Sequence, residues 1–368
     1  MQNIGQKLLF ALCLLGLFSC SPQTHESNQF SASTIMNGEK PTADEYKQVL
    51  AVIRNGEVVC SATAIKNKLL FSAAHCFIDF EEVSVGPGED FEEFDNLFEN
   101  LGENYCQSYT ECLEELNKMT FAWSKRSFLD YHLERIAESL SEGMSIYQGS
   151  GKPGGQIEGN YTIKSITLDY GWIRILKLKL YETFNVLTRI HQRQLDNITE
   201  YDEYSFDYAQ VVLKESLKET EIIRPINEDI ILDNNLPDGS KVILVGFGSQ
   251  LSEEESEEES EEESEEEGEE EEELDPNYGV KMKTELPLAG IIMNDSGLFA
   301  IVAGENHGAC EGDSGGAAYI KFPNGKIKYL GIITAGGDRC GESVLWSNGD
   351  TSVQGNTIIN IKLDPEYI

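Results

Sequence analysis

Two short segments that lie far apart in the chain constrain its fold most. Residues 70–76 read Leu-Phe-Ser-Ala-Ala-His-Cys, and residues 310–316 read Cys-Glu-Gly-Asp-Ser-Gly-Gly. A serine hydroxyl is a weak nucleophile until a neighbouring base takes its proton, and histidine suits that task because its unperturbed pKa lies near neutral pH. We therefore expect the fold to bring His75 to Ser314, a pairing that favours covalent acyl transfer.

Short apolar and β-branched runs separated by turn residues recur along the chain, and they predict an all-β protein. The dipeptide Asn55-Gly56 between two such runs is a strong hairpin signal. Strands are expected at 49–53, 68–71, 161–166, 210–213, 241–246, 298–303 and 329–335.

Two stretches, about 81–143 and 171–200, break the strand pattern because their apolar residues recur at helical spacing. We interpret both as helical insertions in loops, where extra length costs little loop-closure entropy. An apolar stripe on such a helix usually packs against the host domain. Binding of a partner or substrate is the alternative.

The segments around His75 and Ser314 resemble the signatures of the chymotrypsin-like (trypsin-fold) serine proteases, which run like T-A-A-H-C and C-x-G-D-S-G-G. The resemblance covers residues 35 to about 361, apart from the insertions and an acidic run. It implies two packed six-stranded antiparallel β-barrels, with the helical insertions in the first barrel. It also implies an endopeptidase that acts on protein or peptide substrates through an acyl-enzyme on Ser314. No cofactor and no metal are expected for that chemistry.

The resemblance also assigns the other catalytic roles. His75 is expected to act as general base and acid, with Ser314 as the nucleophile. Asp207 is expected to orient the imidazole, because residues 207–213 resemble the family's D-I-A-L-L-x-L segment. Asp196 and Asp202 are competing candidates for that third position.

Further site residues follow from the same resemblance. The N–H groups of Gly312 and Ser314 are expected to form the oxyanion hole. Gly308 falls at the floor of the primary pocket, where trypsin-like members carry Asp, so an uncharged or apolar substrate side chain is expected. The alternative is a basic substrate side chain, which Glu311 beside that pocket would attract. The strand that pairs with the substrate backbone is expected to comprise Thr334, Ala335 (in place of the usual Trp) and Gly336.

Residues 35–38 resemble the new N-terminus that zymogen cleavage creates in this family. We expect cleavage between Thr34 and Ile35, after which the ammonium of Ile35 would pair with Asp313. A buried carboxylate needs such a partner. Residues 20–34 are then a tether or pro-segment, and 35–368 the protease domain.

The first residues have the layout of a secretory signal peptide, because Lys7 precedes an apolar run, 8–18, that is too short to span a bilayer. We assign 1–19 to this signal. The sequence Leu-Phe-Ser-Cys at 17–20 resembles a bacterial lipobox, which implies a lipid on Cys20 and a lipoprotein of the outer membrane or periplasm, secreted only after further processing. An ordinary secretory signal with an incidental cysteine is the alternative.

Cysteine usage agrees with export, because disulfides persist where thiols are not continuously reduced. Spacing alone does not fix which cysteines pair. Of the eight cysteines, Cys13 lies in the signal and Cys20 at its end, which leaves six. The resemblance implies the pairs Cys60–Cys76 and Cys310–Cys340, and the last two of the six, Cys106 and Cys112, would then pair with each other.

The net charge is −37, and 17 glutamates lie in the run 253–273. Self-repulsion and a lack of apolar residues predict a disordered loop at 252–273, in the second barrel. This run either gathers cations and repels acidic substrates, or is a solvated insertion. A chain of this charge should avoid nucleic acid. We expect a monomer, with a basic partner as the alternative to a merely solvated acidic surface.

Two rival functions remain at this point. A protease scaffold can serve as a catalytically inactive binding protein, since fold does not guarantee activity. An esterase using the same serine is disfavoured, because Gly-Asp-Ser-Gly-Gly differs from the G-x-S-x-G turn of α/β hydrolases.

Overall fold

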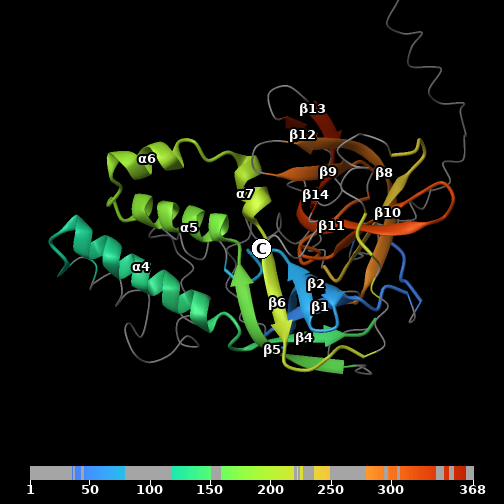
Figure 1. The fold of residues 1–368 in the computed structure, drawn as a ribbon, viewed down its shortest axis with the longest axis horizontal. Helices are drawn as coiled ribbons and strands as arrows, with labels where there is room; N and C mark the ends of the chain where they lie inside the picture. Colours follow the sequence, from blue (N-terminus) through green and yellow to red (C-terminus); the bar gives the residue numbers. More distant parts are fainter. Residues whose placement is uncertain are drawn as a thin grey trace, which may run out of the picture. The chain divides into compact units, whose positions relative to one another are not determined.

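The computed structural model describes residues 35, 38–42, 45–78, 116, 118–150, 159–218, 222, 224–226, 236–248, 279–293, 297–304, 307–336, 344–347 and 352–361. All of them belong to one compact unit. Two closed six-stranded antiparallel barrels dominate it, as predicted (Figure 1). Among these residues, no helix has the length and apolar character needed to cross a membrane.

The first barrel closes in the strand order β1-β2-β3-β6-β5-β4. Its strands are β1 (Val49–Arg54), β2 (Glu57–Lys66), β3 (Leu69–Ser72), β4 (Met144–Gln148), β5 (Gly159–Leu168) and β6 (Ala209–Leu213). Strand β1 is apolar from Val49 to Ile53 because both of its faces are buried there. Leu50 and Val52 pack inside the barrel, whereas Ala51 and Ile53 pack toward the second barrel. The predicted hairpin at Asn55-Gly56 joins β1 to β2.

The second barrel closes in the order β10-β11-β14-β9-β8-β7. Its strands are β7 (Lys241–Gly246), β8 (Met282–Met293), β9 (Leu298–Val302), β10 (Ala317–Lys321), β11 (Ile327–Gly336) and β14 (Thr357–Asn360). A separate two-stranded sheet is formed by β12 (Val344–Ser347) and β13 (Ser352–Gly355). The predicted acidic run lies outside the described residues.

A third apolar cluster joins the two barrels, and its largest members are aromatic. Phe71 and Tyr208 of the first barrel meet edge to face, with ring centroids 4.9 Å apart. Tyr319 and Tyr329 of the second do the same at 6.1 Å. Gln48 donates a hydrogen bond across the interface to the Tyr319 hydroxyl, at 2.8 Å. Such aromatic burial fixes one barrel against the other.

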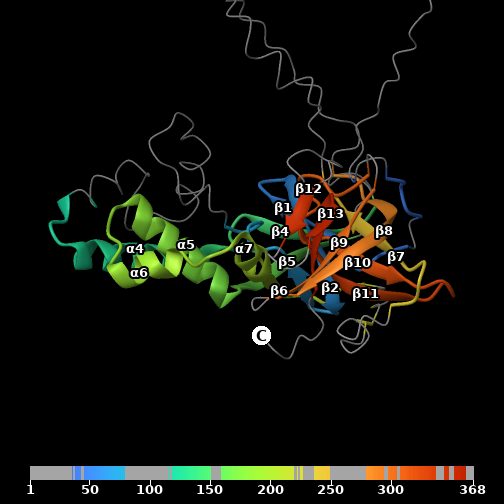
Figure 2. The same ribbon diagram turned by 90° about the horizontal axis from the view of Figure 1, so that it is seen from above.

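Helical insertions occupy two loops of the first barrel, as expected. Helix α4 (Ala122–Ser139) lies between β3 and β4. Helices α5 (Tyr170–Thr183), α6 (Arg189–Leu195) and α7 (Glu200–Phe206) lie between β5 and β6. Figure 2 shows α4, α5 and α6 side by side next to the first barrel. The second insertion extends beyond its predicted end at 200, because α7 continues to the residue before Asp207.

Helix α5 is packed on two sides. Trp172 and Leu176 join the core of the first barrel, and the Trp172 indole N–H donates to the Ile78 carbonyl at 3.3 Å. Tyr181, near the other end, packs with Phe128 of α4. The apolar stripe that predicted this helix therefore packs against the host domain.

Candidate active site

The carboxylate of Asp207 holds His75 through two hydrogen bonds. The imidazole Nδ1 lies 2.7 Å from Oδ2, and the backbone N–H of His75 donates to Oδ1 at 2.9 Å. Asp207 is only 3% exposed, whereas His75 is partly exposed. Because an ionised carboxylate only accepts hydrogen bonds, Nδ1 carries the proton and Nε2 is left as the basic nitrogen.

The two competing acids have other partners. Asp202 closes a capping box at the start of α7, where its side chain accepts from the backbone N–H and hydroxyl of Thr199. Asp196 is the C-cap of α6 and accepts from the Gln192 side chain at 2.9 Å. Asp207 is thus the acid that the structure brings to His75.

Asn360 of β14, which sequence reasoning did not single out, ties α7 to the second barrel. Its side-chain Nδ2 donates to the carbonyls of Tyr204 at 2.8 Å and Ser205 at 3.0 Å, both in the last turn of α7. Asp207 follows this turn as the helix C-cap. The position of the carboxylate therefore depends on both barrels. The signal for this role in the sequence was a polar residue between the apolar residues Ile359 and Ile361.

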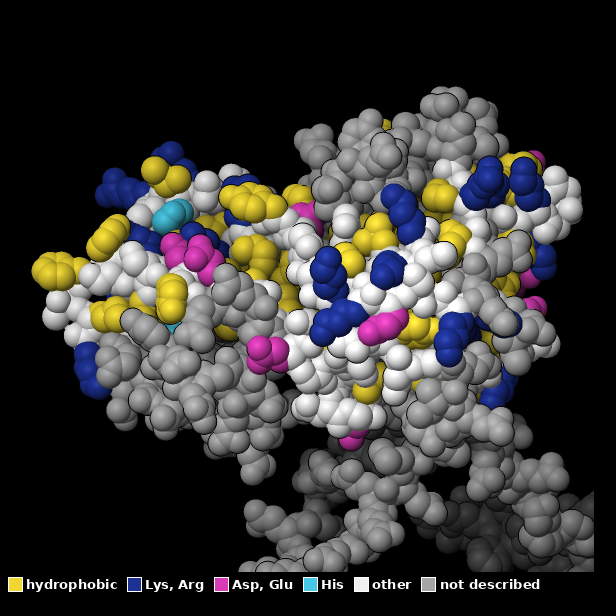
Figure 3. Space-filling view, turned by 60° about the horizontal axis from the view of Figure 1, so that its bottom comes forward, with side chains coloured by type: hydrophobic (Ala, Val, Ile, Leu, Met, Phe, Trp, Pro, Cys, Tyr) yellow, Lys and Arg dark blue, Asp and Glu magenta, His cyan; other side chains and the backbone are white. Residues whose placement is uncertain are grey.

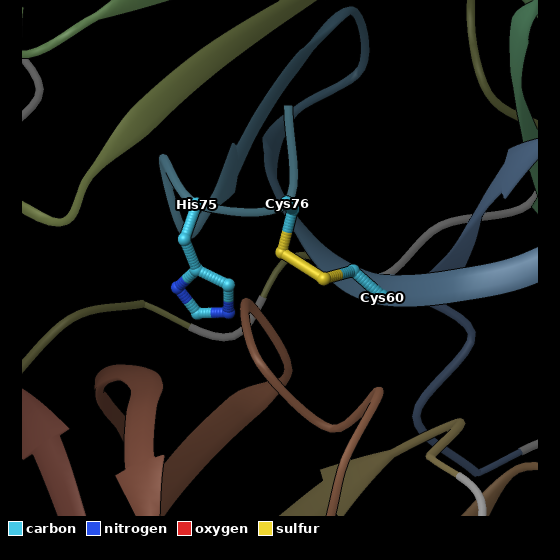
Figure 4. Close-up of side chains that lie close together, drawn as sticks. All are labelled: Cys60, His75 and Cys76. Atoms are coloured by element: carbon cyan, nitrogen blue, oxygen red, sulfur yellow. A yellow bond between two sulfur atoms is a disulfide. The ribbon is translucent and has the colours of Figure 1, made fainter. Parts of the chain in front are cut away.

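A disulfide between Cys60 of β2 and Cys76 fixes the segment that carries His75, in the pairing that the resemblance implied (Figure 4). The two sulfurs lie close to the imidazole, within 4.8 Å. Because the sulfurs are bonded to each other, neither offers a thiolate to a metal ion. The cluster is therefore a covalent brace behind the histidine.

Strand β2 also holds the loop that carries Ser314. The Ser61 N–H donates to the Ser314 carbonyl at 2.9 Å, and the Ser61 hydroxyl donates to the Gly312 carbonyl at 3.0 Å. The Sγ atom of Cys76 lies 3.7 Å from the same Ser314 carbonyl oxygen. One strand thus anchors both the histidine segment and the serine loop.

Glycine is needed at two positions of this loop, Gly312 and Gly315, which have φ angles of 81° and 79°. Residues other than glycine rarely adopt a φ angle of this size. A Cβ on Gly315 would also collide with the Ser61 carbonyl and the Ser72 hydroxyl. The loop can therefore lie against β2 only with glycine at 315.

Two N–H groups in this loop point to an anion site. Within the described part of the chain, no acceptor is found for the backbone N–H of Gly312 or of Ser314. These are the two donors expected to form an oxyanion hole. In the same part of the chain, no hydrogen bond joins Ser314 Oγ to His75. Catalytic hydrogen bonds commonly tighten only when substrate is bound.

Asp313 is completely buried beside the serine and accepts three backbone hydrogen bonds. The donors are the N–H groups of Cys310 and Gly248, each at 2.9 Å, and of Ile35 at 3.3 Å. Burial raises the pKa of this carboxyl to about 6, although the three bonds oppose that rise. Ile35 is itself fully buried in the core of the second barrel. The structure therefore brings together the two residues expected to meet after cleavage, here with Ile35 as a peptide amide.

The predicted pocket residues lie on β11 and on the loop before Ser314. Thr334 is 4% exposed, and Gly336 pairs with Thr357 of the neighbouring strand. Gly308 faces Asn356, a fully buried residue that sequence reasoning missed. Its signal was a polar residue two positions before the apolar pair Ile358-Ile359.

A surface pocket of about 520 Å³ lies elsewhere on the second barrel. It is lined by residues 236–240, 288–291, Met293 and Leu298. None of the predicted site residues contributes to it.

Several predicted residues fall outside the described part of the chain. These are the signal and tether at 1–34, including the lipidation site Cys20, and the cysteines Cys106, Cys112 and Cys340. Cys310 is described and is buried. Its pairing with Cys340 stays a prediction.

Comparison with known proteins agrees with the barrels. Residues 182–347 match the family model described as Trypsin. This segment, less than half of the chain, contains Asp207 and Ser314, whereas His75 lies before it. A search of curated proteins found no match. The matched segment and the two closed barrels together support a chymotrypsin-like fold.

Proposed function

We propose that this protein is a serine endopeptidase that hydrolyses peptide bonds with Ser314, His75 and Asp207. The observation that carries the proposal is the double hydrogen bond from His75 to the buried carboxylate of Asp207. It leaves Nε2 of the imidazole as a base on the side away from Asp207. A trypsin-family domain acts on protein or peptide substrates, which fits this chemistry.

In this mechanism, Nε2 of His75 takes the proton of Ser314 as Oγ attacks the scissile carbonyl carbon. The carbonyl oxygen becomes negatively charged, and the N–H groups of Gly312 and Ser314 stabilise it. Each such donor contributes about 10²–10³ in rate. The imidazolium, stabilised by Asp207, then returns the proton to the departing amine.

The second half of the reaction reuses the same groups. Water enters after the amine has left, and His75 takes a proton from it as it attacks the acyl-enzyme on Ser314. Collapse of the second tetrahedral intermediate breaks the ester, and the imidazolium returns a proton to Oγ. The enzyme is regenerated with all protons accounted for.

Activation by cleavage between Thr34 and Ile35 is part of the proposal. The amide of Ile35 already lies 3.3 Å from the Asp313 carboxylate, so a free ammonium there would supply the positive charge that this carboxylate lacks. Export through the signal at 1–19, with a lipid on Cys20, places the enzyme at the outer membrane or in the periplasm. Cleavage at 34–35 would then free the protease domain from the lipid.

A catalytically inactive binding protein is the second candidate, and one observation favours it. The side chains of Phe121 and Trp123, at the start of α4, are 71% and 73% exposed. Figure 3 shows hydrophobic side chains on the surface over the helical insertions. Exposed aromatic side chains are typical of protein-binding surfaces.

A fluorophosphonate probe distinguishes the two candidates, because it bonds only to an activated serine. We expect labelling of the protein cleaved at 34–35 and of a matched control, Ser216→Ala, which removes an exposed hydroxyl far along the chain. The Ser314→Ala variant should not be labelled. If the cleaved protein with Ser314 intact is not labelled, the result favours the catalytically inactive binding protein.

A further inference from the structure

We propose that Asn356 closes the floor of the primary specificity pocket, so that the enzyme cleaves after small, uncharged side chains such as Ala and Val. The substrate residue before the cleaved bond is here called the pre-scissile residue. This inference rests on the proposed function and names the substrate class of that same site.

The contact between Gly308 and Asn356 carries the inference. A Cβ placed on Gly308 would lie 3.0 Å from Cγ, 3.1 Å from Oδ1 and 3.2 Å from Nδ2 of Asn356. All three distances are shorter than ordinary van der Waals contact. The flat face of the carboxamide therefore covers the Cα of Gly308, in the space where a longer residue at 308 would place its side chain.

Hydrogen bonds fix the carboxamide in that position. The Nδ2 group donates to the carbonyls of Gly304, at 2.7 Å, and His307. The backbone N–H of Asn356 donates to the Val302 carbonyl at 2.9 Å. Because Asn356 is 0% exposed, moving its side chain would break both hydrogen bonds of a buried amide, which is costly.

The next residue strengthens the same closure. The Thr357 hydroxyl accepts from the Ala309 N–H at 3.0 Å and lies 3.4 Å from Asn356 Oδ1. Hydrogen bonds from residues 356–357 and to them thus hold the backbone before Gly308, at Gly304 and His307, and after it, at Ala309. The floor is a bonded layer rather than a single movable side chain.

Two consequences follow for the substrate. A long pre-scissile side chain reaches the carboxamide before Gly308, so Phe, Leu and Lys should fit poorly. A cationic side chain would also meet a neutral amide rather than a carboxylate at this floor. A methyl or isopropyl side chain ends short of the amide and needs no polar partner.

The test uses cleaved protein and four fluorogenic peptide amides that differ only in the pre-scissile residue, namely Ala, Val, Phe and Lys. We expect kcat/KM for Ala and Val to exceed that for Phe and Lys by about 10–200-fold, the range that pocket shape supplies. In Asn356→Gly, the ratio for Phe over Ala should rise at least about tenfold. Gln354→Ala, an exposed amide two residues away, is the matched control and should keep the wild-type order.

Each rate is divided by the concentration of sites that react with the fluorophosphonate, so partial unfolding of a variant does not alter the ratios. Asn356→Ser, which keeps a donor for one carbonyl, serves as the second variant should Asn356→Gly not fold. Efficient cleavage after Phe or Lys by labelled wild-type protein overturns the pocket inference alone. So does an unchanged preference in both variants. Absence of labelling and of all cleavage overturns the proposed function, and this inference with it.

Discussion

Asp207 accepts hydrogen bonds from His75 at two points, the imidazole Nδ1 at 2.7 Å and the backbone N–H at 2.9 Å. The first bond selects the tautomer and the second fixes the segment that carries the ring. Asn360 of the second barrel holds the end of α7 that precedes Asp207. The acid–base pair within the first barrel is therefore aligned by contacts from the second.

Replacing Asp207 by Asn should lower kcat/KM by about 10⁴, because an amide at this position favours the wrong imidazole tautomer. The structure should change little, since Asn has the same size. Peptide hydrolysis at neutral pH measures the loss. Asp196→Asn, which alters an exposed C-cap, is the matched control and should retain full activity. Equal activity in both variants would show that another acid supports His75.

Removing the disulfide with Cys60→Ala and Cys76→Ala should lower the free energy of unfolding by about 3 kcal/mol. This value follows from the chain entropy of a loop whose ends are 16 residues apart. Urea denaturation of the double variant against the oxidised wild-type protein measures it. Activity should fall as well, because the bond braces the segment next to His75. Unchanged stability would mean that the loop is equally ordered without the bond.

Local patterns predicted the parts of the site that depend on local geometry. The Ser314 loop can lie against β2 only because it contains glycines, and the segment that carries His75 is fixed by the disulfide of the neighbouring Cys76. Both residues could therefore be recognised from the residues next to them. The choice between Asp202 and Asp207 was also readable in part, because Thr199 and Asp202 have capping-box spacing. Strand β1 was predictable because burial on both faces makes it apolar from Val49 to Ile53.

Asn356 and Asn360 could not be assigned in the same way. Their roles are set by contacts with Gly308 and with the end of α7, which are formed only when β14 closes the second barrel. A polar residue beside an apolar run shows that something unusual is buried there. It does not indicate which distant backbone groups it binds.

In the uncleaved chain, the contribution of Asp313 to stability should fall as the pH rises from about 4 to 6. Burial raises the pKa of Asp313 from 3.8 to about 6 in the folded state, so the folded protein binds this proton more tightly than the unfolded chain. The contribution of Asp313 to the free energy of unfolding is therefore largest below its unfolded pKa and falls by up to about 3 kcal/mol by the time the pH passes the folded pKa. Urea denaturation between pH 3.5 and 7 measures the change.

Asp313→Asn is the control for that experiment, because it removes the titrating group and keeps its size. The difference in unfolding free energy between the two proteins should vary with pH in the uncleaved form. After cleavage at 34–35, the α-ammonium of Ile35 should abolish or reverse this variation by favouring the charged carboxylate. Parallel curves for uncleaved wild-type protein and Asp313→Asn would contradict the assigned ionisation.

Gly315→Ala should destabilise the protein and abolish activity. Two causes contribute, the backbone penalty of a positive φ and the collision of the new Cβ with neighbouring atoms, and Gly325→Ala separates them. Both glycines have φ near 80°, at 79° and 80°, so alanine carries the same backbone penalty of about 1 kcal/mol at either position. A Cβ at 325 meets nothing within 4 Å, whereas at 315 it would meet the Ser61 carbonyl and the Ser72 hydroxyl. Urea denaturation should therefore show a clearly larger loss for Gly315→Ala, with the excess reporting the contact between the serine loop and β2. Gly325→Ala should keep its rate of fluorophosphonate labelling, and Gly315→Ala should lose it because Ser314 is displaced. Equal losses of stability would mean that the loop moves away from β2 without cost, and that β2 does not fix the nucleophile.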